Sequence, residues 1–140
     1  MSRKILIVDD NEEFGELLGD LLTLDGFSAS HSPDLRHAKE LIELHGEPDF
    51  LILDYWLKAG TTEDFAVSLK FSSPDTKIIM MSGEVEEEKV RRIQKLITEG
   101  VAIAYIAKPF SDEDFRKVIR ALEDPDARGH PPAQPPPPER

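Results

Sequence analysis

The sequence predicts an α/β fold in which a parallel sheet lies between two layers of helices. Three observations support this prediction. Five short apolar runs have the composition of buried strands, and they alternate with five segments whose apolar residues recur at helical spacing. Each helix must return over the sheet before the next strand, which makes the strands parallel and the crossovers right-handed. Polar residues follow the runs, where doubly wound folds place their ligand sites.

The first three elements lie within residues 4–30. Residues 4–8 form a continuous apolar run, and a helix follows it with Asp10 or Asn11 as its N-cap and Gly26 at its end. Residues 27–30 form a weaker strand. The apolar stripe of the helix consists of Phe14, Leu17, Leu18, Leu21 and Leu22.

The second helix is expected to start at Ser32 and Pro33, because serine caps a helix and proline is favoured at the first helical position. Residues 50–53 read as the third strand, and residues 65–71 read as a short third helix. The apolar face of the second helix consists of Leu35, Ala38, Leu41 and Ile42.

The last four elements follow the same alternation. Residues 78–81 and 102–106 are the fourth and fifth strands, and the last helix opens with a capping box of Ser111 and Asp114. The fourth helix turns Val90, Ile93 and Ile97 inward, and the last helix turns in Phe115, Val118, Ile119 and Leu122.

Composition limits the function. A chain of 140 residues, 39% hydrophobic and with a net charge of -11, suits one domain and disfavours direct binding to nucleic acid or to a membrane surface. The absence of cysteine excludes disulfides and thiolate metal sites and is compatible with a cytoplasmic location. No apolar stretch suits a signal peptide or a membrane span. The histidines, which lack metal-ligand spacing, are expected at the surface: His31, His37, His45 and His130.

The chain divides into two parts by composition. Residues 1–124 are expected to form the folded domain. Residues 125–140 hold seven of the eleven prolines without apolar periodicity, and they are expected to be a disordered, proline-rich tail.

Three carboxylates are expected to meet at the edge of the sheet. Asp9 and Asp10 follow the first strand, and Asp54 follows the third. At about 4 Å each pair would repel by roughly 4 kcal/mol at a surface-like dielectric, so either a proton is retained or a cation lies between them. Oxygen ligands alone favour a hard ion such as Mg²⁺.

The remaining edge residues suit phosphoryl transfer, which needs a nucleophile, donors for the phosphoryl oxygens and positive charge. Asp54 is the candidate nucleophile, Ser82 offers a hydroxyl after the fourth strand and Lys108 offers an ammonium after the fifth. Pro109 would fix the turn that orients Lys108, and the Lys108–Pro109 peptide bond could be cis or trans. No phosphate loop or dinucleotide fingerprint is present, which argues against an NTPase or an oxidoreductase.

From about Arg3 to Leu122 the chain resembles the receiver domains of two-component response regulators, the CheY-like family. The resemblance rests on the edge residues above and on two runs, IVDDN at residues 7–11 and AKPF at residues 107–110. It implies a flavodoxin-like sheet of strand order 2-1-3-4-5. It also implies that Asp54 accepts a phosphoryl group from a histidine kinase.

The resemblance also assigns roles around Asp54. Asp10, Asp54 and the backbone carbonyl of Trp56 would hold Mg²⁺ directly, with Asp9 acting through water. Ser82 and Lys108 would contact the phosphoryl group.

Three further residues take roles from the same resemblance. Tyr105 would be the aromatic switch that follows Ser82. Trp56 and Glu84 would flank the path of the hydrolytic water, and the indole would slow loss of the phosphate.

The function predicted is a signalling switch that catalyses only its own phosphorylation and slow dephosphorylation. Its partners would be a sensor histidine kinase or phosphotransfer protein and a downstream protein that binds around the fourth helix, fifth strand and fifth helix, with a homodimer as a further option. This chain shows no output domain of its own. Two alternatives stay open: a receiver-fold scaffold that docks without phosphorylation, and a small hydrolase that uses Asp54 as a covalent nucleophile.

Overall fold

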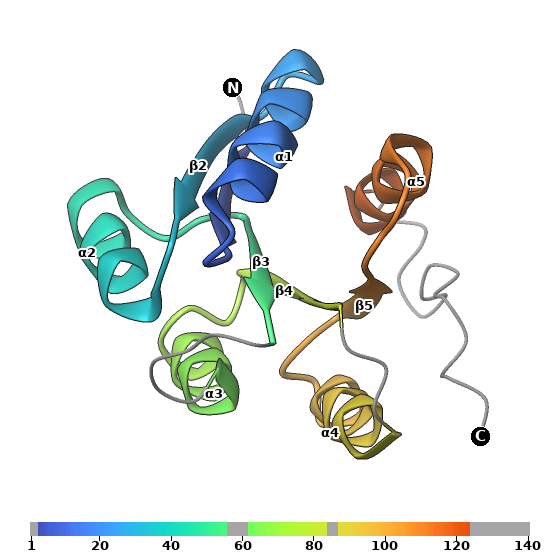
Figure 1. The fold of residues 1–140 in the computed structure, drawn as a ribbon. Coiled ribbons are helices and arrows are strands. Elements are labelled where there is room, and N and C mark those ends of the chain that lie inside the picture. Colours follow the sequence, from blue (N-terminus) through green and yellow to red (C-terminus); the bar gives the residue numbers. More distant parts are fainter. Residues whose placement is uncertain (1–2, 56–61, 84–86, 124–140) are drawn as a thin grey trace.

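The computed structural model describes residues 3–55, 62–83 and 87–123. Five parallel strands form one sheet in the order β2-β1-β3-β4-β5, which confirms the predicted fold and strand order (Figure 1). The strands are β1 Lys4–Val8, β2 Ser28–Ser32, β3 Phe50–Asp54, β4 Lys77–Ser82 and β5 Ala104–Ala107. The helices are α1 Glu12–Leu24, α2 Leu35–His45, α3 Thr62–Ser72, α4 Glu87–Thr98 and α5 Asp112–Glu123.

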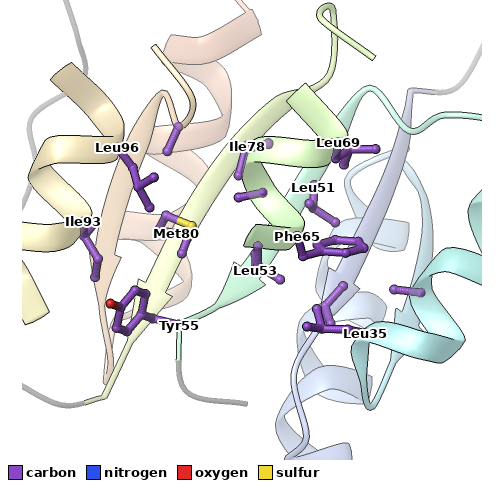
Figure 2. Close-up of a cluster of buried hydrophobic side chains, with 14 of the residues drawn as sticks. Leu35, Leu51, Leu53, Tyr55, Phe65, Leu69, Ile78, Met80, Ile93 and Leu96 are labelled. Atoms are coloured by element: carbon purple, nitrogen blue, oxygen red, sulfur yellow. The ribbon is translucent and has the colours of Figure 1, made fainter. Parts of the chain in front are cut away.

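Helices cover both faces of the sheet, so the molecule has three layers (Figure 1). Side chains of α2, α3 and α4 pack against one face, together with Leu6, Leu51 and Met80 of the strands (Figure 2). Side chains of α1 and α5 pack against the other face, with Ile7 and Ile52. Because successive strand residues point to opposite faces, each central strand contributes to both cores, and its sequence reads as a continuous apolar run.

The second strand and the start of the second helix differ from the prediction. Ser32 is the last residue of β2, and the N-cap of α2 is Asp34, whose side chain accepts a hydrogen bond from the backbone N–H of His37. Ser32 pairs with Val8 in the sheet, which extends the strand past residue 30. The predicted Ser32 cap is therefore wrong, and the helix starts two residues beyond Pro33.

The predicted stripe of α1 is confirmed except at Leu17, because Phe14 and Leu21 also pack against the core. Gly15, Leu18 and Leu22 are buried, whereas Leu17 is 65% exposed. A Cβ at Gly15 would lie 2.3 Å from the His31 ring, so the absence of a side chain lets α1 approach β2 there. His31 is half-buried in this contact, and the prediction that it lies on the surface is wrong.

The remaining boundaries shift by a few residues. The third helix starts earlier than predicted, at Thr62, and its end leaves Phe71 90% exposed. The fifth strand starts at Ala104, and the inward residues of the last helix are those predicted. Within the described ranges no helix has both the length and the apolar character needed to cross a membrane. The predicted tail, residues 125–140, lies outside the described residues.

Candidate functional site

The ends of four neighbouring strands bring the predicted edge residues together. Asp9 directly follows β1, Asp54 is the last residue of β3, and Ser82 is the last residue of β4. In the sheet Val8 pairs with Leu53, and Ser82 pairs with Ala107, the residue before Lys108. The parallel topology therefore places all these side chains at one carboxyl edge.

The three aspartates form a compact group of oxygen donors. One carboxylate oxygen from each of Asp9, Asp10 and Asp54 lies within 4.8 Å of the others. Asp9 is fully buried and Asp54 is 4% exposed, whereas Asp10 is exposed. Removing two carboxylates from water is costly unless positive charge and hydrogen-bond donors accompany them. The group is therefore suited to a hard divalent cation such as Mg²⁺.

Lys108 brings a positive charge to the carboxylates. Its Nζ lies 2.7 Å from Oδ2 of Asp9 and 3.5 Å from Oδ2 of Asp54. The ammonium also lies 4.5 Å from the centre of the Phe14 ring, and the backbone N–H of Lys108 donates to the carbonyl of Ser82 at 2.8 Å. The Lys108–Pro109 peptide bond is cis. The lysine thus joins two of the three carboxylates across the edge.

Hydrogen bonds fix both the side chain and the backbone of Asp9. The carboxylate oxygen that does not contact Lys108, Oδ1, accepts from the backbone N–H of Asn11 at 2.9 Å. Asn11 in turn caps α1 by accepting from the N–H of Phe14. The Nε2 of His31 donates to the backbone carbonyl of Asp9 at 2.8 Å. Sequence reasoning missed this role of His31. The available signal was a histidine on a strand of small residues, opposite the glycine of a neighbouring helix.

Ser82 and Tyr105 are both buried. Ser82 has no exposed surface, and Tyr105 is 4% exposed. The Tyr105 hydroxyl has no hydrogen-bond partner in the part of the chain that the structure describes, and burial raises its pKa above 10. Trp56 and Glu84, predicted to flank the path of water, lie outside the described residues.

Residues 5–120 match the response regulator receiver domain family. The chain belongs to this family. It is 32% identical over 124 residues to the phosphate regulon transcriptional regulatory protein PhoB of Escherichia coli, covering 87% of this chain and 52% of PhoB. It is also 32% identical over 119 residues to the Escherichia coli transcriptional regulatory protein CpxR, covering 85% of this chain and 48% of CpxR. The receiver domain thus spans about half the length of the curated relatives it matches.

Solved structures show the same fold. A CheY-like response regulator receiver domain protein from Methanospirillum hungatei superposes with a TM-score of 0.79 at 21% identity, over 92% of this chain and 98% of that one. The chemotaxis protein CheY4 of Vibrio cholerae superposes with a TM-score of 0.74 at 23% identity, over 86% and 98% of the two chains. The family match makes the chain a receiver domain of a two-component system, which is a signalling domain.

Proposed function

We propose that this receiver domain is a phosphoacceptor switch whose acceptor is Asp54. A carboxylate oxygen of Asp54 would attack the phosphorus of a phosphohistidine, the P–N bond would break, and the imidazole would leave and take up a proton. The observation that carries this proposal is the ammonium of Lys108, which lies between the carboxylates of Asp9 and Asp54 at a buried strand edge. The donor would be a histidine kinase or a phosphotransfer protein.

Mg²⁺ is the proposed cofactor, because the site offers carboxylate oxygens alone. Asp9, Asp10 and Asp54 would hold the ion, and the carbonyl of Trp56, outside the described residues, completes the proposed ligand set. When bound, the ion would offset negative charge on the phosphoryl oxygens. The chain itself supplies the nucleophile, and burial of Asp54 keeps bulk water away from it.

Lys108 and Ser82 are the proposed partners of the transferred group. The Lys108 ammonium, 3.5 Å from Asp54, would bind an equatorial phosphoryl oxygen, and the Ser82 hydroxyl would donate to another. Tyr105 is the proposed switch residue, because its buried hydroxyl lacks a partner among the described residues and its position does not depend on a hydrogen bond there. Trp56 and Glu84 remain the proposed modulators of phosphate loss.

The proposed output is a change in a protein-binding surface around α4, β5 and α5. Phosphorylation would shift the receiver domain between two conformational populations. The net charge of -11 disfavours direct contact with DNA, so the signal is proposed to pass through a protein partner, by docking or by pairing of two copies. The proposed location is the cytoplasm, and the proposed domain comprises residues 1–124 with the proline-rich tail beyond it.

Intact mass tests the acceptor. The chain is incubated with Mg²⁺ and a small phosphodonor such as acetyl phosphate, and one phosphate adduct is expected. Asp54→Asn removes the nucleophile and should abolish the adduct. Asp75→Asn changes an exposed aspartate next to the start of β4, at the opposite edge, and should keep it. Absence of an adduct from the natural chain would refute the proposal and favour a scaffold that docks without phosphorylation.

A further inference from the structure

Tyr55 directly follows Asp54, and its side chain leaves the end of β3 for the core between α3 and α4. It is 9% exposed and belongs to the cluster that contains Phe65 and Ile93. Figure 2 shows the ring extending from the end of β3 toward Ile93 of α4. The residue next to the proposed acceptor therefore reaches the helix that forms part of the proposed output surface.

The backbone of Tyr55 is hydrogen-bonded to the sheet directly after Asp54. Its N–H donates to the carbonyl of Met81 on β4 at 2.8 Å, which extends the β3–β4 ladder by one residue. Asp54 and Tyr55 consequently share one fixed stretch of main chain. A displacement of this stretch at Asp54 would also move the ring of Tyr55.

The hydroxyl of Tyr55 connects two helices. It donates to Oε2 of Glu63 on α3 at 2.6 Å, and it interacts with the guanidinium of Arg92 on α4. Burial, followed by the hydrogen bond to Glu63, raises the pKa of Tyr55 above 10, so the phenol is protonated and can donate at neutral pH. Glu63 and Arg92 also attract each other as opposite charges. The phenol thus interacts with a carboxylate on one helix and with a guanidinium on the next.

Arg92 interacts with Tyr55, whereas the neighbouring Arg91 pairs only within α4 in the described structure. Arg91 pairs with Glu87 at 3.5 Å, and Arg92 lies 3.9 Å from Glu88, so each has a glutamate partner one turn earlier on α4. Arg92 adds the contact with Tyr55 outside its own helix. The two arginines are therefore a matched pair in which one side chain reaches the end of β3.

We propose that Tyr55 is a positioning residue that tethers α4 to the end of β3, because its ring extends toward Ile93 of α4 and its hydroxyl donates to Glu63 of α3. A change at Asp54 reaches α4 through this contact, and the tether sets how strongly the two are coupled. The inference rests on the proposed phosphorylation of Asp54. It adds a defined route from the acceptor to the output surface.

Amide hydrogen exchange tests the tether in the full chain. Tyr55→Phe keeps the ring and removes the hydroxyl that interacts with Glu63 and Arg92, Arg92→Gln removes the cation, and Arg91→Gln is the matched control. In the unphosphorylated protein, exchange within α4 should be about fivefold faster in Tyr55→Phe and Arg92→Gln, as expected for loss of roughly one hydrogen bond. Arg91→Gln should match the natural chain. After incubation with acetyl phosphate and Mg²⁺, the change in α4 exchange should be smaller in the first two variants.

The outcomes separate the tether from the proposed function. Exchange rates that are equal in all four proteins before phosphorylation would overturn the tether, whatever happens at Asp54. Faster exchange with an undiminished response to phosphate would show a stabilising contact that carries no signal, and would overturn the coupling. Intact mass on the same samples reports the adduct. Its absence from the natural chain would refute phosphorylation and, with it, the coupling, while the unphosphorylated rates would still report whether the contact holds α4.

Discussion

Replacing Lys108 with methionine would remove the one ammonium that contacts both Asp9 and Asp54 in the described structure. The lysine side chain is 21% exposed, and the side chains of Asp9 and Asp54 are 0% and 6% exposed, so both carboxylates would stay buried after losing this counter-charge. Breaking a buried ion pair costs about 3 to 5 kcal/mol. Partial exposure of the lysine places the expected loss near the lower figure, about 3 kcal/mol, with a fall in Tm of about 10 °C.

Urea unfolding at neutral pH, in EDTA and again in Mg²⁺, measures this loss. Mg²⁺ should stabilise Lys108→Met more than the natural chain, because the bound cation would replace the missing charge and would no longer face the ammonium. Lys117→Met, an exposed lysine of α5, is the matched control and should change stability by about 0.5 kcal/mol at most. A Lys108→Met variant as stable as the natural chain in EDTA, or equally responsive to Mg²⁺, would refute the electrostatic account of the site.

Two further predictions concern buried positions. Tyr105→Phe removes a buried hydroxyl without a partner in the described structure and should raise the free energy of unfolding by about 1 kcal/mol. Burial raises the pKa of Tyr105, so the unfolded chain ionises first and stability should fall from about pH 10 until the pH passes the folded-state pKa. Urea titrations up to pH 11 should show a shallower fall in the variant, which has no phenol to ionise at this position. Gly15→Ala should destabilise by about 1 to 3 kcal/mol in thermal unfolding, because the new Cβ would meet the His31 ring at 2.3 Å. Gly19→Ala, with 3.9 Å to its nearest neighbour, should stabilise by up to about 1 kcal/mol, and equal effects would contradict the steric argument.

The layered fold was predictable because its strands are buried on both faces. Every residue of Phe50–Asp54 is buried, and such a run is visible without knowledge of any partner. The strand Ser28–Ser32 was placed less well because it lies at the edge of the sheet, where small polar residues are tolerated and give little hydrophobic signal. Its end is set by pairing with β1, which the local sequence does not show.

The sequence predicts which residues lie at the site, but it does not predict the distances between their side chains. Parallel topology alone brings Asp9, Asp54 and Lys108 to one edge. That the ammonium lies closer to Asp9 than to Asp54 depends on side-chain conformations in the folded protein. The contacts of His31 and Tyr55 depend on register and helix packing, so neither role could be read from spacing along the chain.

The two edge strands of the sheet bear on how copies of the protein could associate. An edge strand with unpaired N–H and C=O groups can pair with a strand from another molecule, and long, flat, apolar edge strands do so most readily. Here the edge strand β2 has five residues of sequence SASHS, and the edge strand β5 has only four. Both are poor templates for sheet extension. Within the described part of the chain, helical surfaces suit self-association better than these strands do, and their use would leave the carboxyl ends of the strands accessible to a phosphodonor.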